Sequence, residues 1–416
     1  MKYTAERTSL EADELLQINV PECERPYAFW LVSVPWIGQG AVPALLKAFG
    51  SPEEIYKRSD NELRYGKSRK NGIEALLEYR RTHDIFSEYE RFLKSGMKLT
   101  FVWDMDYPGR LLHIPDPPIA LFYYGNLPEK DRLSVAVIGA RMCSGYGAKL
   151  AGELGSELGK NGVNVISGMA AGIDGISQMA ALSSGGASYG VLGSGADICY
   201  PESNRTLYER LKENGGIISS YPPGTKAIAG FFPPRNRIVS GLADAVVVLE
   251  ARARSGTLIT VNMALEQGRD IYAAPGRLGD ELSAGCNGLI GHGASVYLSP
   301  EIFMRDLFED HADRLSSGKP AIAFEKNYVR TNFDSACDKR HRGYDCEKER
   351  EPALDESHLN VYRQLSLYPQ SAEEIDEKLR QQNIISPGET GICLILMELC
   401  LDDLAIQVSS GQFCRK

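Results

Sequence analysis

The chain has 416 residues, about three domains' worth, of which 43% are hydrophobic and 24% are charged. No run of about 18 apolar residues is present, which excludes a transmembrane helix. The net charge of −9 argues against a generally basic nucleic-acid binder, but residues 134–300 balance 13 Lys and Arg against 13 Asp and Glu, so a local basic groove remains possible there.

Residues 1–100 predict a small helical domain of the helix-hairpin-helix or SAM-like kind. They begin with MKYTAERTSLEADELL, a polar and acidic stretch in which we expect no secretory signal. Apolar residues at helical spacing follow in AVPALLKAF and GIEALLEYR. The segment VPWIGQGA, residues 34–41, is typical of a phosphate-binding hairpin between helices. A plain turn is the alternative, because its flanks are not strongly basic.

Residues 104–310 predict a Rossmann-like domain. They open with a connector rich in Pro and Tyr, residues 104–133. Short apolar strands that alternate with helices are typical of a parallel sheet covered by helices on both faces, the α/β class. From Ser134 to about Ser299 the chain holds seven such runs: SVAVIGA, VNVISG, SYGVLGSG, GIISSY, AVVVLEA, DIYAAPG and SVYLS.

Two segments complete the chain. Residues 311–353 predict a charged linker, and residues 334–352 are almost without apolar side chains, which indicates disorder. Residues 354–416 regain helical periodicity, with a capping box from Ser371 to Glu374 and a hairpin at Ser410-Gly411. Three helices and a hairpin predict a winged-helix-like domain. Its 5 basic and 10 acidic residues should repel phosphate, so we expect it to contact protein rather than DNA.

The first predicted binding element is the glycine turn after the first strand of the predicted parallel sheet. It contains Gly139, Arg141, Ser144, Tyr146 and Gly147. Glycines at such a turn let backbone N–H groups face an anion, and the N-terminus of the following helix adds partial positive charge. The spacing is not G-x-G-x-x-G, so we do not expect NAD. We expect Arg141 to bind phosphate and Tyr146 or a neighbouring aromatic to stack on a base, against the alternative of an ordinary tight turn.

Two further glycine turns follow strands of the same sheet. One contains Gly168 and ends at Asp174, which we expect to cap its own helix rather than to contact a ligand. The other contains Ser255 and Gly256, preceded by two arginines in EARARSGT. Because ligands of open α/β sheets bind at the carboxyl ends of the strands, we expect the three turns to form one anion site.

The segment between the fourth and fifth runs is the densest in candidate contacts. Lys226 is followed by Phe231, Phe232 and then Arg235-Asn236-Arg237. Arginine grips phosphate with a planar fork, and aromatic faces stack on unpaired bases. We expect the phenylalanines to lie in the core, and Lys226, Asn236 and at least one of the two arginines to contact an anion. Pairing of the arginines with internal carboxylates is the alternative.

Several kinds of site have no support in the sequence. The six histidines are dispersed without metal-ligand spacing, and there is no Walker A sequence or G-x-S-x-G motif. Nine cysteines without a C-x-x-C pair argue against a zinc ribbon and a disulfide framework, and favour a reducing compartment. We therefore expect a cytoplasmic binding protein with no metal, no cofactor and no catalytic residue.

Taken together, these segments resemble the DprA/Smf family over about residues 104–300. The resemblance implies an extended Rossmann-like core, a homodimer, binding of single-stranded DNA in natural transformation and delivery of that strand to the RecA recombinase. The flanking helical and winged-helix-like domains also resemble the family's three-part layout. The matching segments, in family order, are DPPIALFYYGN, VAVIGARMCSGYG, SGMAAGID, VLGSGADICYP, YPPG, FFPPRNRIVSGLAD, EARARSGTLIT, GRDIYAAPG and GCNGLIGHGA.

The resemblance also assigns residues and shows departures. The family's G-S-R turn corresponds to Gly139-Ala140-Arg141, and its F-P-x-R-N-R motif corresponds to Arg235-Asn236-Arg237. Ala171 replaces an arginine of the family's second turn, Ser177-Gln178 replaces A-H, and Glu202 stands where a basic residue is common. We expect these departures to weaken DNA binding and to reduce its salt dependence.

Two functions of different classes follow from the sequence. The first is a single-stranded DNA-binding mediator without catalysis, which protects incoming DNA and helps to load RecA. The second is an enzyme or sensor for a nucleotide-like small molecule, because relatives of this fold with similar glycine turns bind nucleotides.

Overall fold

The computed structural model describes residues 20–34, 39–65, 70–312, 354–366, 370–382, 384, 387–402, 404–409 and 411–415. The chain forms two compact units, Met1–Ile322 and Ala323–Lys416. The predicted disordered stretch 334–352 lies outside the described residues, and the finer domain boundaries proposed above stay predictions.

The first unit begins with short helices, as the periodicity predicts. Ser51 and Glu54 form a capping box at the start of one helix, and the Asp84 carboxylate accepts two backbone N–H bonds at the start of another. Trp30 and Ile55 are buried at the centre of this helical part. The helices are α2 (Arg25–Ser33), α3 (Val42–Phe49), α4 (Pro52–Lys57), α5 (Asp60–Tyr65), α6 (Lys70–Thr82) and α7 (Ile85–Lys94).

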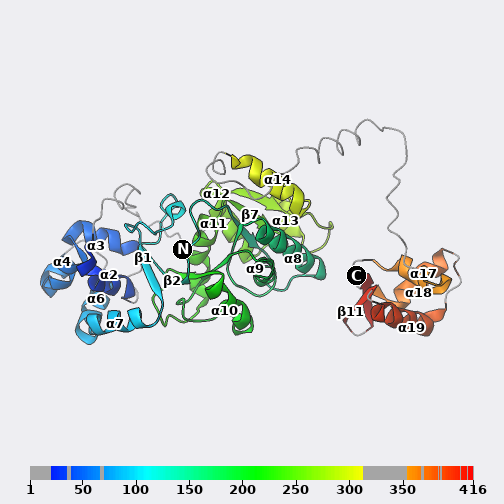
Figure 1. Ribbon diagram of the computed structural model, residues 1–416, viewed down its shortest axis with the longest axis horizontal. Coiled ribbons are helices and arrows are strands. Elements are labelled where there is room, and N and C mark those ends of the chain that lie inside the picture. The colour runs from blue at the N-terminus through cyan, green and yellow to red at the C-terminus, as the bar shows by residue number, and fades with distance from the viewer. Residues whose placement is uncertain are drawn as a thin grey trace. The chain divides into compact units, whose positions relative to one another are not determined.

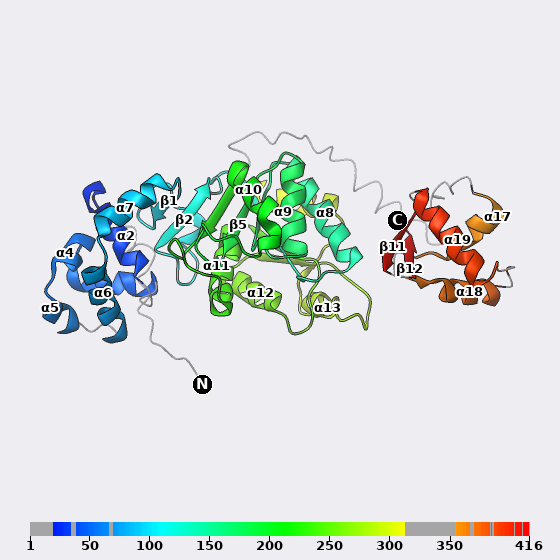
Figure 2. The same ribbon diagram turned by 90° about the horizontal axis from the view of Figure 1, so that it is seen from below.

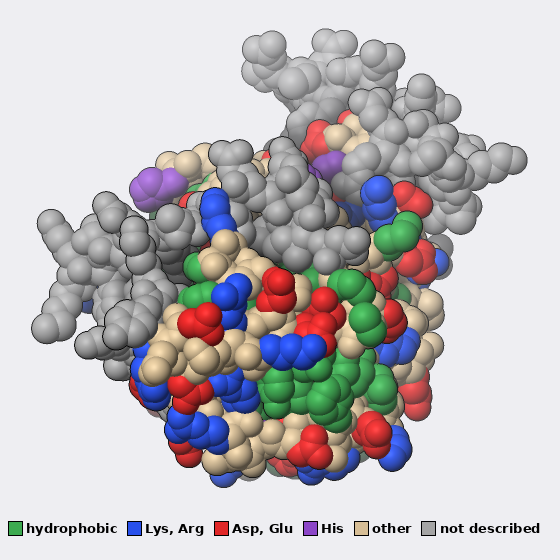
Figure 3. Space-filling view, turned by 90° about the vertical axis from the view of Figure 1, so that its left-hand side faces the viewer, with side chains coloured by type: hydrophobic (Ala, Val, Ile, Leu, Met, Phe, Trp, Pro, Cys, Tyr) green, Lys and Arg blue, Asp and Glu red, His purple; other side chains and the backbone are tan. Residues whose placement is uncertain are grey.

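The predicted phosphate-binding hairpin at residues 34–41 is only partly described. A short 3₁₀ turn, η2 (Gln39–Ala41), leads into α3, and residues 35–38 lie outside the described residues. On the face that carries the N-terminal helices, Lys and Arg side chains alternate with Asp and Glu around a hydrophobic patch (Figure 3). This face therefore offers a phosphate no continuous basic surface.

The centre of the first unit is a nine-stranded sheet, formed by the described residues in the order β1-β2-β6-β5-β4-β3-β7-β8-β9. The strands from β6 to β9 are parallel, and β2 pairs antiparallel with both β1 and β6. All seven predicted runs contain a strand, which confirms the Rossmann-like α/β class. The strands are β1 (Lys98–Phe101), β2 (Ala120–Gly125), β3 (Ser134–Ile138), β4 (Asn164–Ser167), β5 (Ser188–Leu192), β6 (Gly215–Ser219), β7 (Ala245–Val248), β8 (Asp270–Ala273) and β9 (Ser295–Val296).

Helices cover both faces of this sheet because each central strand is apolar on both sides. Val135 and Val137 of β3 pack into one core cluster, and Ala136 and Ile138 of the same strand pack into another. Figures 1 and 2 show α8 (Gly145–Lys160), α9 (Ile173–Ser183) and α10 (Arg205–Glu213) on one side of the sheet. On the other side lie α11 (Phe232–Leu242), α12 (Gly256–Glu266) and α13 (Ala284–Gly291). A further helix, α14 (Pro300–Asp310), packs with α8.

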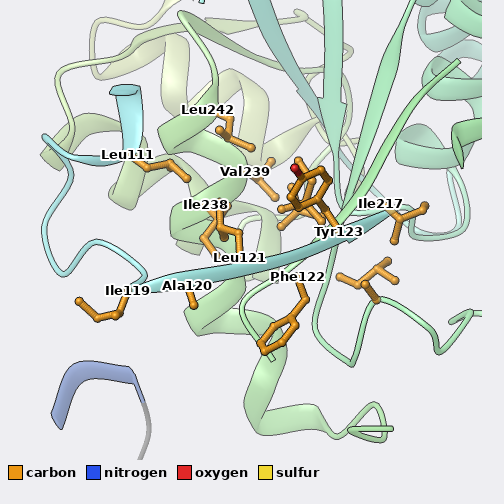
Figure 4. Close-up of a cluster of buried hydrophobic side chains, with 14 of the residues drawn as sticks. Leu111, Ile119, Ala120, Leu121, Phe122, Tyr123, Ile217, Ile238, Val239 and Leu242 are labelled. Carbon is orange, nitrogen blue, oxygen red and sulfur yellow. The ribbon is translucent and has the colours of Figure 1, made fainter. Parts of the chain in front are cut away.

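The segment predicted as a connector, residues 104–133, contains part of the sheet, and that prediction is corrected here. Residues 120–125 of this segment form β2. The strand before it, β1, begins at Lys98, inside the range 1–100 that is predicted as helical. Leu121 of β2 lies beside Ile238 of α11 in a buried cluster that also contains Leu111 and Leu242 (Figure 4). The connector therefore anchors α11, the helix that carries the predicted Arg235-Asn236-Arg237 motif.

The second unit has its own small core. Helices α17 (Glu356–Gln364), α18 (Ala372–Gln381) and α19 (Gly388–Leu401) pack around Ile375, Leu396 and Phe413. A three-stranded sheet is formed by β10 (Gln370–Ser371), β12 (Gln412–Arg415) and β11 (Ala405–Ser409) in that order. The predicted capping box at Ser371 and the hairpin between β11 and β12 are both present. The winged-helix assignment itself stays a prediction.

Three features of the described residues bear on the kind of protein. Helices there are too short or too polar to cross a membrane. No group of three or more His, Cys, Asp or Glu side chains in that part could hold a metal ion. The seven cysteines in that part are free: Cys23, Cys143, Cys199, Cys286, Cys393, Cys400 and Cys414.

Candidate nucleic-acid interface

The order of the parallel strands reverses between β3 and β7, and ligands of open α/β sheets bind at the carboxyl ends of the strands at such a point. The turn that begins at Gly139 follows β3, and Ser255-Gly256 follows β7. The Thr257 hydroxyl donates a hydrogen bond to the Gly139 carbonyl at 3.3 Å, so the two turns lie in contact. Two of the three predicted turns therefore meet at the point where ligands of such folds bind.

The third turn and the loop after β5 extend this rim. Gly172 has a φ of 77° and packs so closely on the first turn that a Cβ would lie 2.3 Å from the Ala140 carbonyl oxygen, which explains the glycine. Asn204 donates side-chain hydrogen bonds to the carbonyls of Met169 (3.0 Å) and Ala170 (3.1 Å). The ends of β3, β4, β5 and β7 thus form one continuous edge.

The helix N-terminus predicted to bind phosphate at α8 is already occupied by a carboxylate of the protein. Glu250, which is 1% exposed, accepts hydrogen bonds from the backbone N–H of Ser144 (2.9 Å) and from the Ser144 hydroxyl. The Ser144 hydroxyl accepts in turn from the Gly147 N–H at 3.2 Å. Gly147 has no room for a Cβ, which would lie 2.3 Å from Glu250 Oε2. We therefore no longer expect Ser144 and Gly147 to reach a phosphate.

Arg235 and Gly168 are likewise used inside the protein. Arg235 is 5% exposed, and its guanidinium donates to the carbonyls of Gly168 (3.0 Å) and Val191. The buried Asp174 carboxylate accepts from the Gly168 N–H at 3.1 Å. Its role is therefore structural, but it does not cap its own helix as predicted, because α9 has no side-chain capping bond. A Cβ on Gly168 would lie 2.8 Å from Arg235 Nη2 and 2.9 Å from Asp174 Oδ2, so the two charges flank this glycine.

Burial dominates the protonation of this pair. It lowers the pKa of Arg235 to about 10, although the nearby Asp174 charge acts in the opposite direction. Burial also raises the pKa of Asp174, against the opposing effect of Arg235. The hydrogen bond from Arg235 to the Gly168 carbonyl holds α11 to the turn after β4, and we withdraw Arg235 and Gly168 from the set of expected phosphate contacts.

Arg237 faces the connector. It donates to the carbonyls of Asp116 (2.8 Å) and Pro234 (2.7 Å), its Nε lies 4.0 Å from Asp116 Oδ2, and its side chain is 16% exposed. The side-chain carbonyl of Asn236 accepts from Arg235 Nε at 3.2 Å. Pairing with a carboxylate, the alternative considered for these arginines, therefore applies to Arg237, whereas Arg235 is held by backbone carbonyls.

The loops after β3, β6 and β7 carry four exposed cations, which are Arg141, Lys226, Arg252 and Arg254. We call them the cationic rim. Among the described residues, Arg141 has no carboxylate within ion-pairing distance, while Arg252 reaches Glu281 at 3.5 Å in a solvent-exposed pair. Ser255 is the N-cap of α12 and makes no side-chain capping bond, so this helix N-terminus still faces the rim uncapped.

Aromatic side chains accompany the rim. The Arg141 guanidinium lies 5.6 Å from the centre of the Phe232 ring, which is tilted against the Tyr200 ring at 5.5 Å. Tyr200 is 44% exposed, whereas the hydroxyl of Tyr146 donates to the Pro275 carbonyl at 3.0 Å. Tyr200 is therefore better placed than Tyr146 to stack on a base.

The two charge departures from the family have different consequences. Glu202 forms a bidentate pair with Arg205 (2.8 and 3.0 Å), so most of its negative charge is neutralised locally. Ala171 is exposed beside the turn of Arg141, with no cation in the place of the family's arginine. If the departures weaken DNA binding as expected from the sequence, Ala171 should contribute more to that loss than Glu202.

A surface pocket lies elsewhere on the first unit. It has a volume of about 660 Å³ and is lined at the amino ends of β5 and β6 by Ala187 and Gly215, together with Lys98, Tyr123 and Arg132. Its charged side chains are of both signs, with Asp106, Glu129 and Glu213 beside the two cations. This cavity is at the edge of the sheet opposite to the cationic rim and adds nothing to it.

Comparison with known proteins places the whole central region in one family. Residues 98–308 match the sequence model described as DNA recombination-mediator protein A. The chain is 43% identical over 198 residues to the DNA processing protein DprA of Streptococcus pneumoniae, covering 48% of this chain and 70% of that protein. It is 34% identical over 289 residues to the protein Smf of Synechocystis, covering 67% and 72%.

A solved structure agrees with the sequence comparisons. The X-ray structure of DNA processing protein A from Streptococcus pneumoniae superposes with a TM-score of 0.58 at 32% identity. The match covers 68% of this chain and 97% of that one.

Proposed function

Because the chain belongs to the DNA recombination-mediator protein A family, we propose that it binds single-stranded DNA and delivers the strand to the RecA recombinase. In this proposal it protects incoming DNA in natural transformation and recombination, and it catalyses no reaction itself. The observation that carries the proposal is the exposed Arg141 at the strand-order reversal, flanked by the other cations of the rim and by an exposed aromatic ring.

The geometry supports binding of a flexible strand rather than of a single phosphate. The rim cations lie on the loops after three different strands, β3, β6 and β7, so they can contact successive phosphates of one backbone. The Arg141 guanidinium offers a planar fork for phosphate oxygens. Tyr200 offers a face for an unpaired base, and stacking of this kind is tolerant of sequence.

The homodimer and the location are further parts of the proposal. β9 is one of the two edge strands of the sheet formed by the described residues. Val296 in this strand and Leu298 just after it are 39% and 61% exposed. A second copy of the chain would cover these apolar side chains, and light scattering of the purified protein tests for a dimer. A partner of RecA acts in the cytoplasm, which is the location we propose.

A competition experiment tests the proposed ligand. A labelled oligo-dT bound to the protein should be displaced by unlabelled oligo-dT, and far less well by duplex DNA or mononucleotides of equal phosphate content. A mononucleotide at 100 times its dissociation constant would raise the free energy of unfolding by about 2.7 kcal/mol. If a mononucleotide stabilised the protein in this way and oligo-dT did not displace that mononucleotide, a nucleotide enzyme or sensor would be favoured instead.

Restoring the missing cation at residue 171 should strengthen DNA binding. Ala171 is exposed beside Arg141, so Ala171→Arg adds a phosphate contact without burying charge. We expect oligo-dT to bind several-fold tighter, and the slope of log affinity against log salt to become steeper by about 0.7. Fluorescence anisotropy measures both quantities. The neutral variant Ala171→Gln is the control, and an equal gain there would contradict the electrostatic reason.

A further inference from the structure

The outward face of α19 in the second unit is apolar. Leu394, Met397 and Leu401 are 60%, 53% and 85% exposed, whereas Ile392, Leu396 and Leu399 of the same helix are fully buried in the core. The three exposed residues recur at the i, i+3, i+7 spacing that places side chains on one face of a helix. An apolar stripe at this spacing is the pattern by which amphipathic helices dock on one another.

Acidic groups border this stripe. A surface pocket of about 350 Å³ is lined by Asp355, Glu398 and Asp402, together with His358, Leu354 and Leu401. The carboxylates come from α19 and from the start of α17, and the two leucines form apolar walls. The apolar stripe thus ends in a pocket with three negative charges.

His358 holds the pocket together. Its Nδ1 lies 2.7 Å from Asp355 Oδ2, and its Nε2 lies 2.5 Å from Glu398 Oε2. Hydrogen bonds with these two carboxylates raise the pKa of His358, so the charged imidazolium is favoured. The three carboxylates outweigh this positive charge, so the pocket stays negative. The hydrogen bond between His358 and Glu398 also joins α17 to α19.

We propose that this surface, formed by Leu394, Met397, Leu401 and the acidic pocket, docks an amphipathic helix of a partner protein that carries arginine or lysine beside its apolar residues. The aliphatic stem of an arginine fits between Leu354 and Leu401, and its planar fork suits the carboxylates of Glu398 and Asp402. The apolar residues of the partner helix cover the stripe. A nucleic acid is disfavoured, because residues 354–416 hold 5 basic and 10 acidic residues.

The test uses the full-length chain and a synthetic amphipathic helix of about 15 residues with leucines on one face and arginines beside them. Methyl NMR of methionine-labelled protein reports directly on Met397. The peptide should shift the Met397 signal, and a peptide with glutamate in place of arginine should not. Leu401→Asp and, independently, Leu394→Asp should each weaken binding at least tenfold.

The control variant is Leu93→Asp, since Leu93 is a leucine of similar exposure (58%) on α7 of the first unit. It should leave peptide binding unchanged. Equal binding of the arginine and glutamate peptides, or an unmoved Met397 signal, would overturn the proposal. A Met397 shift produced by duplex DNA would instead assign the face to nucleic acid. A fall in molecular mass on Leu401→Asp would assign it to a second copy of the chain.

Discussion

Replacing Arg235 by methionine should destabilise the first unit by about 3 to 5 kcal/mol, because the buried carbonyls of Gly168 and Val191 would lose their charged donor. A hydrogen bond to a charged group is worth about 1.5 to 3 kcal/mol. Methionine has a similar length but no charge, so the buried Asp174 would also lose the favourable influence of a nearby cation. For a unit of this size the midpoint of thermal unfolding should fall by about 10 °C.

Calorimetry of the purified variants measures this effect. Arg254→Ala, which removes an exposed arginine of the same domain, should stay within about 0.5 kcal/mol of the parent. The double variant Asp174→Asn with Arg235→Met should recover part of the loss, because it removes the unpaired charge. A loss below about 1 kcal/mol for Arg235→Met alone would show that the pair is not a structural clamp.

Arg141→Ala should weaken binding of oligo-dT several-fold, the second large effect that the structure predicts. Arg141 is exposed at the strand-order reversal, has no carboxylate partner among the described residues and contacts only an aromatic ring. Its removal therefore costs one phosphate contact and leaves the fold intact. The slope of log affinity against log salt should become shallower by about 0.7.

The matched control for Arg141 is Arg132→Ala. Arg132 is also an exposed arginine of the first unit, but it lines the cavity at the amino ends of the strands. Its removal should leave the affinity for oligo-dT unchanged. Equal losses in both variants would mean that binding follows overall charge and not the cationic rim.

The sequence predicted the sheet well because buried parallel strands are continuous apolar runs, which stand out between helices. It missed β1 and β2, since the prolines around IALFYYG made that strand look like part of a connector. The convergence of the glycine turns at the carboxyl ends of the strands also followed from the predicted class, whereas the strand order came from the structure. These features depend on short sequence patterns, which do not depend on contacts with distant parts of the chain.

The identity of the exposed cations did not follow from the sequence. Arg235 and Arg141 are the same type of residue, yet Arg235 is buried near Asp174 and Arg141 is exposed to solvent. Glu250 fills the N-terminus of α8 from a position 106 residues away, a contact that no local pattern reports. The sequence indicated this contact only through the position of Glu250 just after a buried strand, where a carboxylate needs a hydrogen-bond partner.

The most direct test of the cationic rim is the affinity of the parent protein for oligo-dT between 50 and 200 mM salt. Four exposed cations that each neutralise one phosphate predict a log–log slope of about −3 and an affinity loss of about 50-fold over this range. Duplex DNA should bind more weakly throughout. A slope near zero, with single-stranded and duplex DNA bound equally, would contradict the account.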